Sequence, residues 1–310
     1  MPASSARLGF GLAAVGRPAY ITTDRDADLG DPVDRSIPAL RGRAHLLLDE
    51  AWGLGIRYID VARSYGLAEE FLGGWLAAHP GRRSGIVIGS KWGYAYVGGW
   101  KMDAAVHERK EHSAAMFDRQ WPETLAALGS APDFFLIHSV TPDSPALADI
   151  EVLQRVRRLR VEGVRVGLST SGPHQADVIR AAMRLDDSPF TVVQSTWNLR
   201  ESSAGAALVE AHDAGWTVVV KEALANGELA SAVPGGALAS AASGVAPDLF
   251  ALGAALSQPF ADIVLSGATT LAHLRRGVEA RALEVDRSVL AELATDPSDY
   301  WRRRSERPWR

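Results

Sequence analysis

Four side chains that could together protonate a carbonyl oxygen follow apolar runs of this sequence. Asp60 and Tyr65 lie in DVARSYG, Lys91 ends GIVIGSK, and His138 lies near the end of DFFLIHS. A phenol with an ordinary pKa near 10 is a poor acid at neutral pH, and a neighbouring ammonium lowers that pKa by stabilising the phenolate. We therefore expect Tyr65 to be the proton donor and Lys91 to lower its pKa.

The other two side chains would support this acid. A buried lysine needs a carboxylate partner to stay charged, and Asp60 is expected to be that partner. His138 would orient the substrate oxygen as negative charge develops on it. Each residue alone has an ordinary structural explanation, but the four together do not. Reduction of a carbonyl also needs a hydride, which no side chain supplies, so a nicotinamide cofactor is expected.

The elements that must position these side chains are short apolar runs separated by segments of helical periodicity. Strict alternation of strand and helix predicts parallel pairing through crossover helices, and eight repeats favour closure. The predicted fold is α/β, a (β/α)8 TIM barrel with long loops at its C-terminal face, formed as a single domain by residues 1–310. The predicted strands are 7–13, 56–62, 85–91, 133–139, 164–170, 191–197, 217–223 and 262–268. The predicted helices are 43–55, 68–79, 119–129, 150–163, 175–185, 204–215, 237–256 and 271–280.

An open doubly wound sheet is the alternative fold. Such a sheet normally has a G-x-G-x-x-G turn after its first strand, and Gly9 and Gly11 match only its beginning. The polar stretch that follows, to about residue 42, is therefore interpreted as a long barrel loop. A second long interruption, residues 93–114, is either a substrate wall or an ordinary covering loop.

Composition excludes several classes of function. The net charge of -4 and the scattered basic residues argue against a nucleic-acid partner. The absence of cysteine excludes disulfides and thiolate chemistry and favours a reducing compartment. No apolar stretch approaches the roughly 20 residues of a membrane span, and glycines interrupt the apolar opening that resembles a secretory signal. A cytoplasmic protein is expected. The histidines of HERKEH (107–112) have the wrong spacing for a zinc-binding helix, so a solvated loop and no metal are expected.

The motifs DVARSYG, GSK, LIHS and GLSTS, followed by Gln194 and GATTLAHLRRGVEA, resemble the aldo-keto reductase superfamily in order and spacing over nearly the whole chain. The resemblance implies that the four side chains above form a catalytic tetrad. It also implies that NADPH, bound extended across the barrel mouth, reduces a small-molecule aldehyde or ketone. The cofactor contacts implied are Gly11, Leu12, Asp60, Ser169, Thr170, Gln194, Lys221, Gly267, Thr269, His273 and Arg276. The substrate wall implied is Trp92, Tyr94, Tyr96, Trp197 and Trp301.

The chain departs from this family's pattern at several positions. Thr170 replaces the usual Asn, and Lys221 stands where a Tyr usually stacks on the nicotinamide. A cation cannot stack on a ring that becomes positive, so either Lys221 turns toward phosphate or a ring such as Trp197 replaces the Tyr. His273 and Gly277 replace the usual Arg and Asn of the 2′-phosphate region. The remaining basic residues and the start of a helix still favour NADP over NAD.

Two other functions are compatible with parts of the sequence. A Schiff-base lyase could use Lys91 or Lys221 as nucleophile, although Asp60, Tyr65 and His138 would then have no role. A nicotinamide-binding regulatory module would retain the cofactor site and have little turnover. The sequence leaves the substrate, the direction of reaction and the oligomeric state open.

Overall fold

A computed structural model describes residues 7–21, 34–231 and 233–309. Within them, eight parallel strands form a closed barrel in the order β1-β10-β9-β8-β7-β6-β3-β2. The predicted (β/α)8 barrel is confirmed, and the open sheet is excluded. Each predicted apolar run overlaps one strand, and β3 and β6 extend one residue beyond their runs. The strands are β1 (Arg7–Gly11), β2 (Tyr58–Asp60), β3 (Val87–Trp92), β6 (Phe134–Val140), β7 (Arg165–Thr170), β8 (Val192–Thr196), β9 (Thr217–Lys221) and β10 (Ile263–Ser266).

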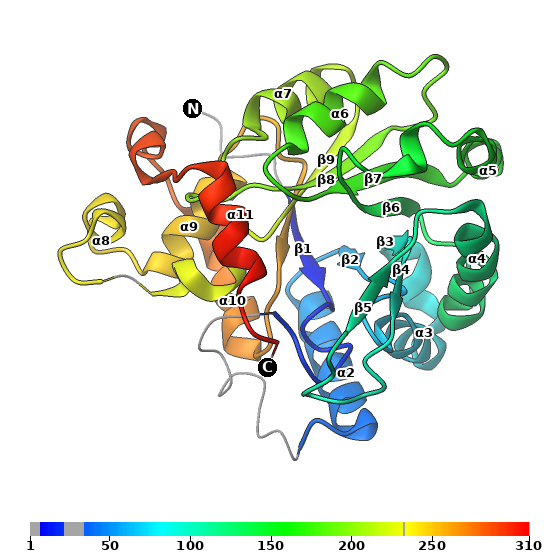
Figure 1. Ribbon diagram of the computed structural model, residues 1–310. Helices are drawn as coiled ribbons and strands as arrows, with labels where there is room; N and C mark the ends of the chain where they lie inside the picture. The colour runs from blue at the N-terminus through cyan, green and yellow to red at the C-terminus, as the bar shows by residue number, and fades with distance from the viewer. Residues whose placement is uncertain (1–6, 22–33, 232, 310) are drawn as a thin grey trace.

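Helices surround the barrel, as Figure 1 shows. They cover the outer faces of the strands, which explains why the strands read as continuous apolar runs. The helices are α2 (Ile37–Gly53), α3 (Ala68–Ala78), α4 (Ala114–Leu128), α5 (Ile150–Val161), α6 (Gln175–Met183), α7 (Gly205–Asp213), α8 (Ala237–Ala242), α9 (Pro247–Leu256), α10 (Leu271–Glu279) and α11 (Pro297–Ser305). Short 3-10 helices occupy Pro80–Gly85, Pro145–Leu147, Ala225–Ala230, Ala280–Ala282, Arg287–Val289 and Ala291–Leu293.

Two predicted helices begin earlier than expected because serine caps precede them. Ser36 accepts a hydrogen bond from the Ala39 amide, and Ser113 accepts one from the Met116 amide. The predicted helix 237–256 is wrong as a single helix. Left-handed backbone at Ser243 and Gly244 (φ 47° and 86°) ends α8, and α9 follows.

Two additional segments lie at the C-terminal face. The interruption after β3 contains an antiparallel hairpin of β4 (Tyr94–Tyr96) and β5 (Glu108–Lys110). After α11, the chain returns to the first loop, where Trp309 pairs with Ile21 in an isolated antiparallel bridge. Both segments border the barrel mouth (Figure 1).

Two further expectations concern the opening of the chain and the presence of membrane-spanning helices. Residues 1–6 of the opening, and residues 22–33 of the first long loop, lie outside the described residues. Residues 7–11 belong to the opening that resembles a secretory signal, and they form a strand of the barrel. In the described parts of the chain, no helix has the length and apolar character needed to cross a membrane.

Candidate active site

A buried ion pair lies where β2 and β3 end at the C-terminal face. The side chains of Lys91 and Asp60 are 1% and 2% exposed. The Lys91 ammonium donates to both oxygens of Asp60, with 2.6 Å between Nζ and Oδ2, and to the carbonyl of Val61 at 3.0 Å. Burial lowers the pKa of Lys91, and the Asp60 carboxylate opposes that effect. Asp60 therefore fixes the position of the ammonium in the way the sequence predicted.

Tyr65 and His138 lie next to this pair. The Tyr65 hydroxyl oxygen is 3.5 Å from Nε2 of His138, and Lys91 Nζ is 4.7 Å from the centre of the Tyr65 ring. The hydroxyl of Ser64 is 3.3 Å from the other ring nitrogen of His138. The structure thus brings the four side chains singled out in the sequence into one site.

The expectation of a lowered pKa for Tyr65 is wrong as a net effect in this structure. Burial raises the pKa of Tyr65 well above its ordinary value, and the negative charge of Asp60 raises it further. Asp60 also balances the ammonium charge that was expected to act on the phenol. Tyr65 consequently remains protonated at neutral pH.

His138 is uncharged in the same site. Its pKa lies well below the ordinary value because the ring is buried and because the positive charges of Lys91 and Lys221 are near. A neutral imidazole has one N–H donor and one acceptor nitrogen, so His138 can donate a hydrogen bond or accept one. A phenol and a neutral imidazole together suit a polar, uncharged oxygen such as that of a carbonyl.

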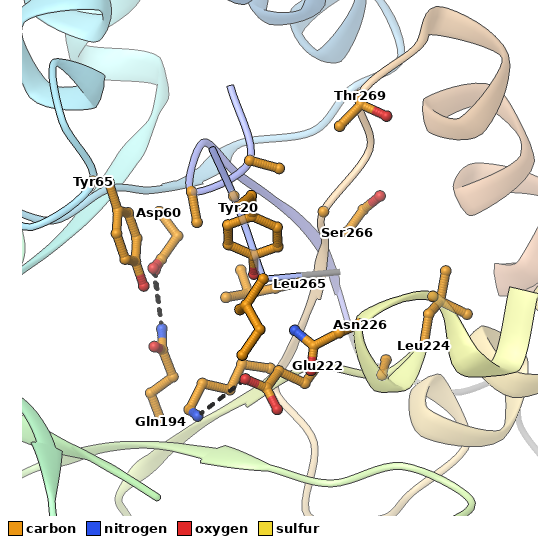
Figure 2. Close-up of a pocket in the computed structure, with 18 of the residues that line it drawn as sticks. Tyr20, Asp60, Tyr65, Gln194, Glu222, Leu224, Asn226, Leu265, Ser266 and Thr269 are labelled. Carbon is orange, nitrogen blue, oxygen red and sulfur yellow. Dashed lines mark hydrogen bonds and ion pairs between the residues drawn. The ribbon is translucent and has the colours of Figure 1, made fainter. Parts of the chain in front are cut away.

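A cavity of about 220 Å³ opens above these side chains. In Figure 2, Tyr65, Asp60 and Gln194 form one side of it, while Glu222 and Asn226 lie across from them. Gln194 donates its side-chain amide to Asp60, with 3.0 Å between Nε2 and Oδ2. The cavity thus borders the catalytic candidates on one side and the segment after β9 on the other.

The cofactor residues implied by the resemblance divide into three groups: three buried residues, six that line this cavity, and two that line a second cavity. Ser169 and Thr170 are fully buried, and neither lines the cavity. The Ser169 hydroxyl accepts from the Ser139 amide at 2.8 Å, and that of Thr170 bonds Ser195 at 2.8 Å. Leu12 is fully buried as well. The cavity is lined by Gly11, Asp60, Gln194, Lys221, Gly267 and Thr269. A contact of any of them with a cofactor stays a prediction.

A second cavity, of about 540 Å³, adjoins the first and holds two further predicted residues, His273 and Arg276. Arg276 forms an ion pair with Asp248. Its buried Nε has no hydrogen-bond partner within the described residues. An unpartnered guanidinium N–H in a cavity suits an added anionic oxygen. The two cavities share Leu224, Gly227, Leu252, Ser266 and Gly267.

The segment after β9 contributes a carboxylate that sequence reasoning missed. Glu222 has a φ of 57°, so Lys221 and Glu222 both line the cavity, whereas regular strand geometry would point them to opposite faces. Arg304 of α11 donates to Glu222 through Nε, 2.9 Å from Oε2, and through Nη2. Burial alone would raise the pKa of Glu222, but Arg304 and Lys221 outweigh it and lower that pKa to about 2. The run of arginines near the end of the sequence gave no indication of this partner.

Arg17 of the first loop is a second residue that the sequence did not single out. It is buried, and its Nη1 donates to the Ser64 carbonyl at 2.8 Å and to Glu108 Oε1 at 2.7 Å. Its guanidinium carbon lies 5.3 Å from the Tyr65 ring centre and 4.6 Å from that of Trp309. Arg17 thereby joins the first loop, the hairpin and the C-terminal tail over the catalytic tyrosine candidate.

The predicted substrate wall is only partly assembled. Trp92 packs in the core against Phe117, and Trp197 packs against Phe260, so Trp197 does not replace a stacking ring in the cavity. Trp301 is 8% exposed and lies beside Tyr300.

Two predicted tyrosines belong to the hairpin. The Tyr94 ring centre is 4.9 Å from that of His138, whereas the Tyr96 hydroxyl accepts a hydrogen bond from the Trp100 amide at 3.1 Å. Trp309, which stacks on His107 with ring centres 4.5 Å apart, lines the cavity instead of Trp301.

The expectation of a solvated HERKEH loop is also wrong. His107 and His112 are 7% and 4% exposed, and His112 Nε2 is 2.7 Å from the carbonyl oxygen of His138. His112 is thus buried against the barrel, and His107 is buried against Trp309 of the tail. Within the described residues, no three or more His, Cys, Asp or Glu side chains are grouped so that they could hold a metal ion.

Comparison with known proteins adds to this geometry. The model of the Aldo/keto reductase family matches residues 39–295. Protein tas of Escherichia coli (strain K12) is 27% identical over 314 residues, which cover 81% of this chain and 88% of that protein. The holo form of the aldo-keto reductase AKR11C1 from Bacillus halodurans superposes with a TM-score of 0.71 at 22% identity, covering 94% of this chain and 92% of the other. At that identity, the structural likeness concerns the fold.

Proposed function

This chain belongs to the aldo/keto reductase family, and we propose that it reduces an aldehyde or ketone to an alcohol with NADPH as hydride donor and Tyr65 as proton donor. Membership of the family makes the chain a carbonyl oxidoreductase. The observation that carries the finer proposal is the Tyr65 hydroxyl, which lies 3.5 Å from a neutral His138 and opens onto the cavity.

The chain's own residues support a proton transfer from Tyr65. A carbonyl oxygen in the cavity would accept hydrogen bonds from the Tyr65 hydroxyl and from an N–H of His138. As negative charge develops on that oxygen, the phenol proton moves to it. The phenolate left behind is then stabilised by the Lys91 ammonium, which Asp60 holds 4.7 Å from the ring centre. By stabilising the phenolate, Lys91 opposes the upward pKa shift that burial and Asp60 cause.

Two adjoining cavities fit an extended nicotinamide dinucleotide. When bound, the reduced nicotinamide supplies the hydride that no side chain can provide. Gln194 and Thr269 would contact it in the first cavity, and His273 and Arg276 would meet its phosphate in the second. The unpartnered Nε of Arg276 supports NADPH over NADH, because a 2′-phosphate would give this donor an acceptor. Among known neighbours, the Bacillus halodurans enzyme is described as a holo form.

The test is a pair of titrations with NADPH and NADH followed by quenching of tryptophan fluorescence, and then an assay of aldehyde-dependent NADPH oxidation with the alcohol identified by mass spectrometry. We expect saturable quenching that is tighter with NADPH, and one alcohol formed for each NADPH oxidised. Absence of a saturable response to both nucleotides would remove the hydride source and overturn the proposal.

A Schiff-base reaction is the second candidate, because Lys221 lines the cavity and burial lowers its pKa to about 8. Lys91 is less suited to this role since Asp60 and Val61 accept hydrogen bonds from its ammonium. If Lys221 formed an imine with an aldehyde and released water, borohydride would reduce that imine to a secondary amine, and the protein would gain the mass of the aldehyde less one oxygen atom. We expect no such adduct.

A further inference from the structure

Three cationic side chains in or beside the first cavity each bind a carboxylate closely. Lys91 binds Asp60, with 2.6 Å between Nζ and Oδ2. Arg17 binds Glu108 at 2.7 Å, and Arg304 binds Glu222, with 2.9 Å between Nε and Oε2. Within each pair, the positive and the negative charge balance.

Lys221 is a fourth cation, and its contact with a carboxylate is longer than those of the other three. Its Nζ is 3.9 Å from Glu222 Oε1, which is longer than a hydrogen bond, because Arg304 already occupies both oxygens of Glu222. In the described structure, its ammonium donates to the Thr196 hydroxyl at 2.9 Å. An ammonium has three donors, so capacity for an anionic acceptor remains.

The position of this ammonium is set by its neighbours. The Thr196 hydroxyl accepts from Lys221 and is 3.3 Å from Glu222 Oε2, to which it can donate. The left-handed backbone at Glu222 keeps Lys221 and Glu222 on the same cavity. A buried cation held in place beside a cavity is costly unless a partner compensates it, and a bound anion would do so.

We propose that Lys221 binds a carboxylate of the substrate, so that the substrates of this site are oxo acids, aldehydes or ketones that carry a carboxylate. The inference rests on the proposed function and specifies its substrate class. Binding places the carboxylate on Lys221 and the carbonyl oxygen at Tyr65 and His138, within one cavity.

A cofactor phosphate is the other source of an anionic oxygen. The location of Lys221 favours the substrate. Lys221 lines the same cavity as Tyr65 and His138, so the ammonium lies at the reacting end. The basic residues suited to phosphate, His273 and Arg276, line the second cavity instead.

The experiment compares two aldehydes of matched shape, 4-carboxybenzaldehyde and its neutral methyl ester, in NADPH oxidation at pH 7. The variants are Lys221→Met and, as a control, Lys101→Met, which alters an exposed lysine that does not line the cavity. We expect wild type and the control to prefer the acid by at least about tenfold in kcat/KM. Lys221→Met should lose about 10- to 100-fold on the acid, mainly through KM, and remain within about threefold on the ester.

One binding measurement and one kinetic comparison separate the remaining outcomes. The NADPH Kd of Lys221→Met should stay within about threefold of wild type. A Kd increase above tenfold with the acid preference intact would assign Lys221 to a cofactor phosphate and overturn the oxo-acid proposal. Equal use of acid and ester by wild type would overturn it while leaving the reductase function in place.

The alcohol product, 4-carboxybenzyl alcohol, provides a readout that needs no turnover. Its binding is followed by tryptophan fluorescence in wild type and in Lys221→Met. Weaker binding of the alcohol to the variant supports the carboxylate site, even if the protein reduces neither aldehyde. Failure to reduce either aldehyde would contradict the proposed function but not the carboxylate site. Equal binding to both proteins overturns the site.

Discussion

Tyr65 holds its proton in this site because burial and the charge of Asp60 both raise its pKa. A proton donor with a high pKa is useful only if its conjugate base is stabilised as the proton leaves. The ammonium of Lys91 lies 4.7 Å from the ring centre and can provide that stabilisation. Asp60 therefore has two opposing effects, because it positions Lys91 and also disfavours the phenolate.

The Lys91–Asp60 pair leads to a prediction about stability. Asp60→Asn leaves an uncompensated ammonium in the barrel, which should lower the free energy of unfolding by about 3 to 5 kcal/mol. The double variant Asp60→Asn/Lys91→Met should recover most of that loss but show no more reductase activity than Asp60→Asn. Urea unfolding monitored by circular dichroism measures this, and a double variant that is less stable than Asp60→Asn would contradict the account.

Lys221 leads to a prediction about pH. The groups that face it are Glu222, Arg304, Lys91 and Asp60, and burial lowers its pKa to about 8. The ammonium is present below that pKa and lost above it, so preference for the carboxylated aldehyde over its ester should be greatest near pH 7 and decline above about pH 8. Measuring kcat/KM for both aldehydes from pH 6 to 9.5 tests this. A preference independent of pH would contradict it.

That these four side chains lie together could be predicted from the sequence, because each lies near the carboxyl end of a strand or in the loop after it, and strand ends meet at one face of a barrel. The direction of the Tyr65 pKa shift could not be predicted from the sequence. It depends on how deeply the ring is buried and on the close pairing of Lys91 with Asp60. Glu222 was missed for a similar reason. Its side chain enters the cavity only because its backbone is left-handed.

Among the elements, α11 stabilises the cavity through Arg304 and Glu222, which gives an acid-stability prediction. The folded pKa of Glu222 is about 2, below its unfolded value, so the pair stabilises the fold above about pH 4.5 and loses this effect as pH falls toward 2. Wild type should lose on the order of 3 kcal/mol through this pair over that range. Glu222→Gln should be less stable at pH 7 and fall less steeply in acid.

Urea unfolding at pH 7, 4 and 3 gives the comparison for Glu222→Gln. Glu292→Gln, which changes an exposed carboxylate, is the matched control. Parallel pH profiles for wild type and Glu222→Gln would show that the ion pair does not stabilise the fold.

The contact between β7 and β8 gives a second prediction at this scale. A Cβ at Gly167 would lie 2.0 Å from the Val192 carbonyl oxygen on the paired strand, so Gly167→Ala must separate the strands. It should lower the free energy of unfolding by more than about 3 kcal/mol. Gly42→Ala at an exposed position of α2, where a Cβ would meet no atom within 4 Å, should raise stability by about 0.5 to 1 kcal/mol. Equal melting temperatures for the two variants would contradict this.

The strands could be predicted well because buried parallel strands are apolar along their whole length. The break between α8 and α9 was missed because the helical periodicity continues across Ser243 and Gly244. The β4–β5 hairpin was missed because its strands have little apolar alternation and are stabilised by contacts with the barrel, including that of His112 with His138.

In the molecule as a whole, the barrel mouth is built from segments that are distant in sequence. Arg17 of the first loop, Glu108 of the hairpin and Trp309 of the tail meet above Tyr65. No local pattern predicts contacts over such separations. The barrel follows from its repeats, whereas the wall of the cavity beside Tyr65 depends on contacts that only the folded chain defines.

The most direct test of the central claim is the single-turnover rate of NADPH oxidation by an aldehyde in wild type, Tyr65→Phe and Tyr96→Phe. The control removes a hydroxyl that bonds the hairpin backbone outside the cavity. If Tyr65 is the proton donor, its variant should bind NADPH as wild type does and oxidise it about 10²- to 10⁴-fold more slowly, while the control stays within about threefold. A Tyr65→Phe protein that reduces the aldehyde at the wild-type rate would contradict the account.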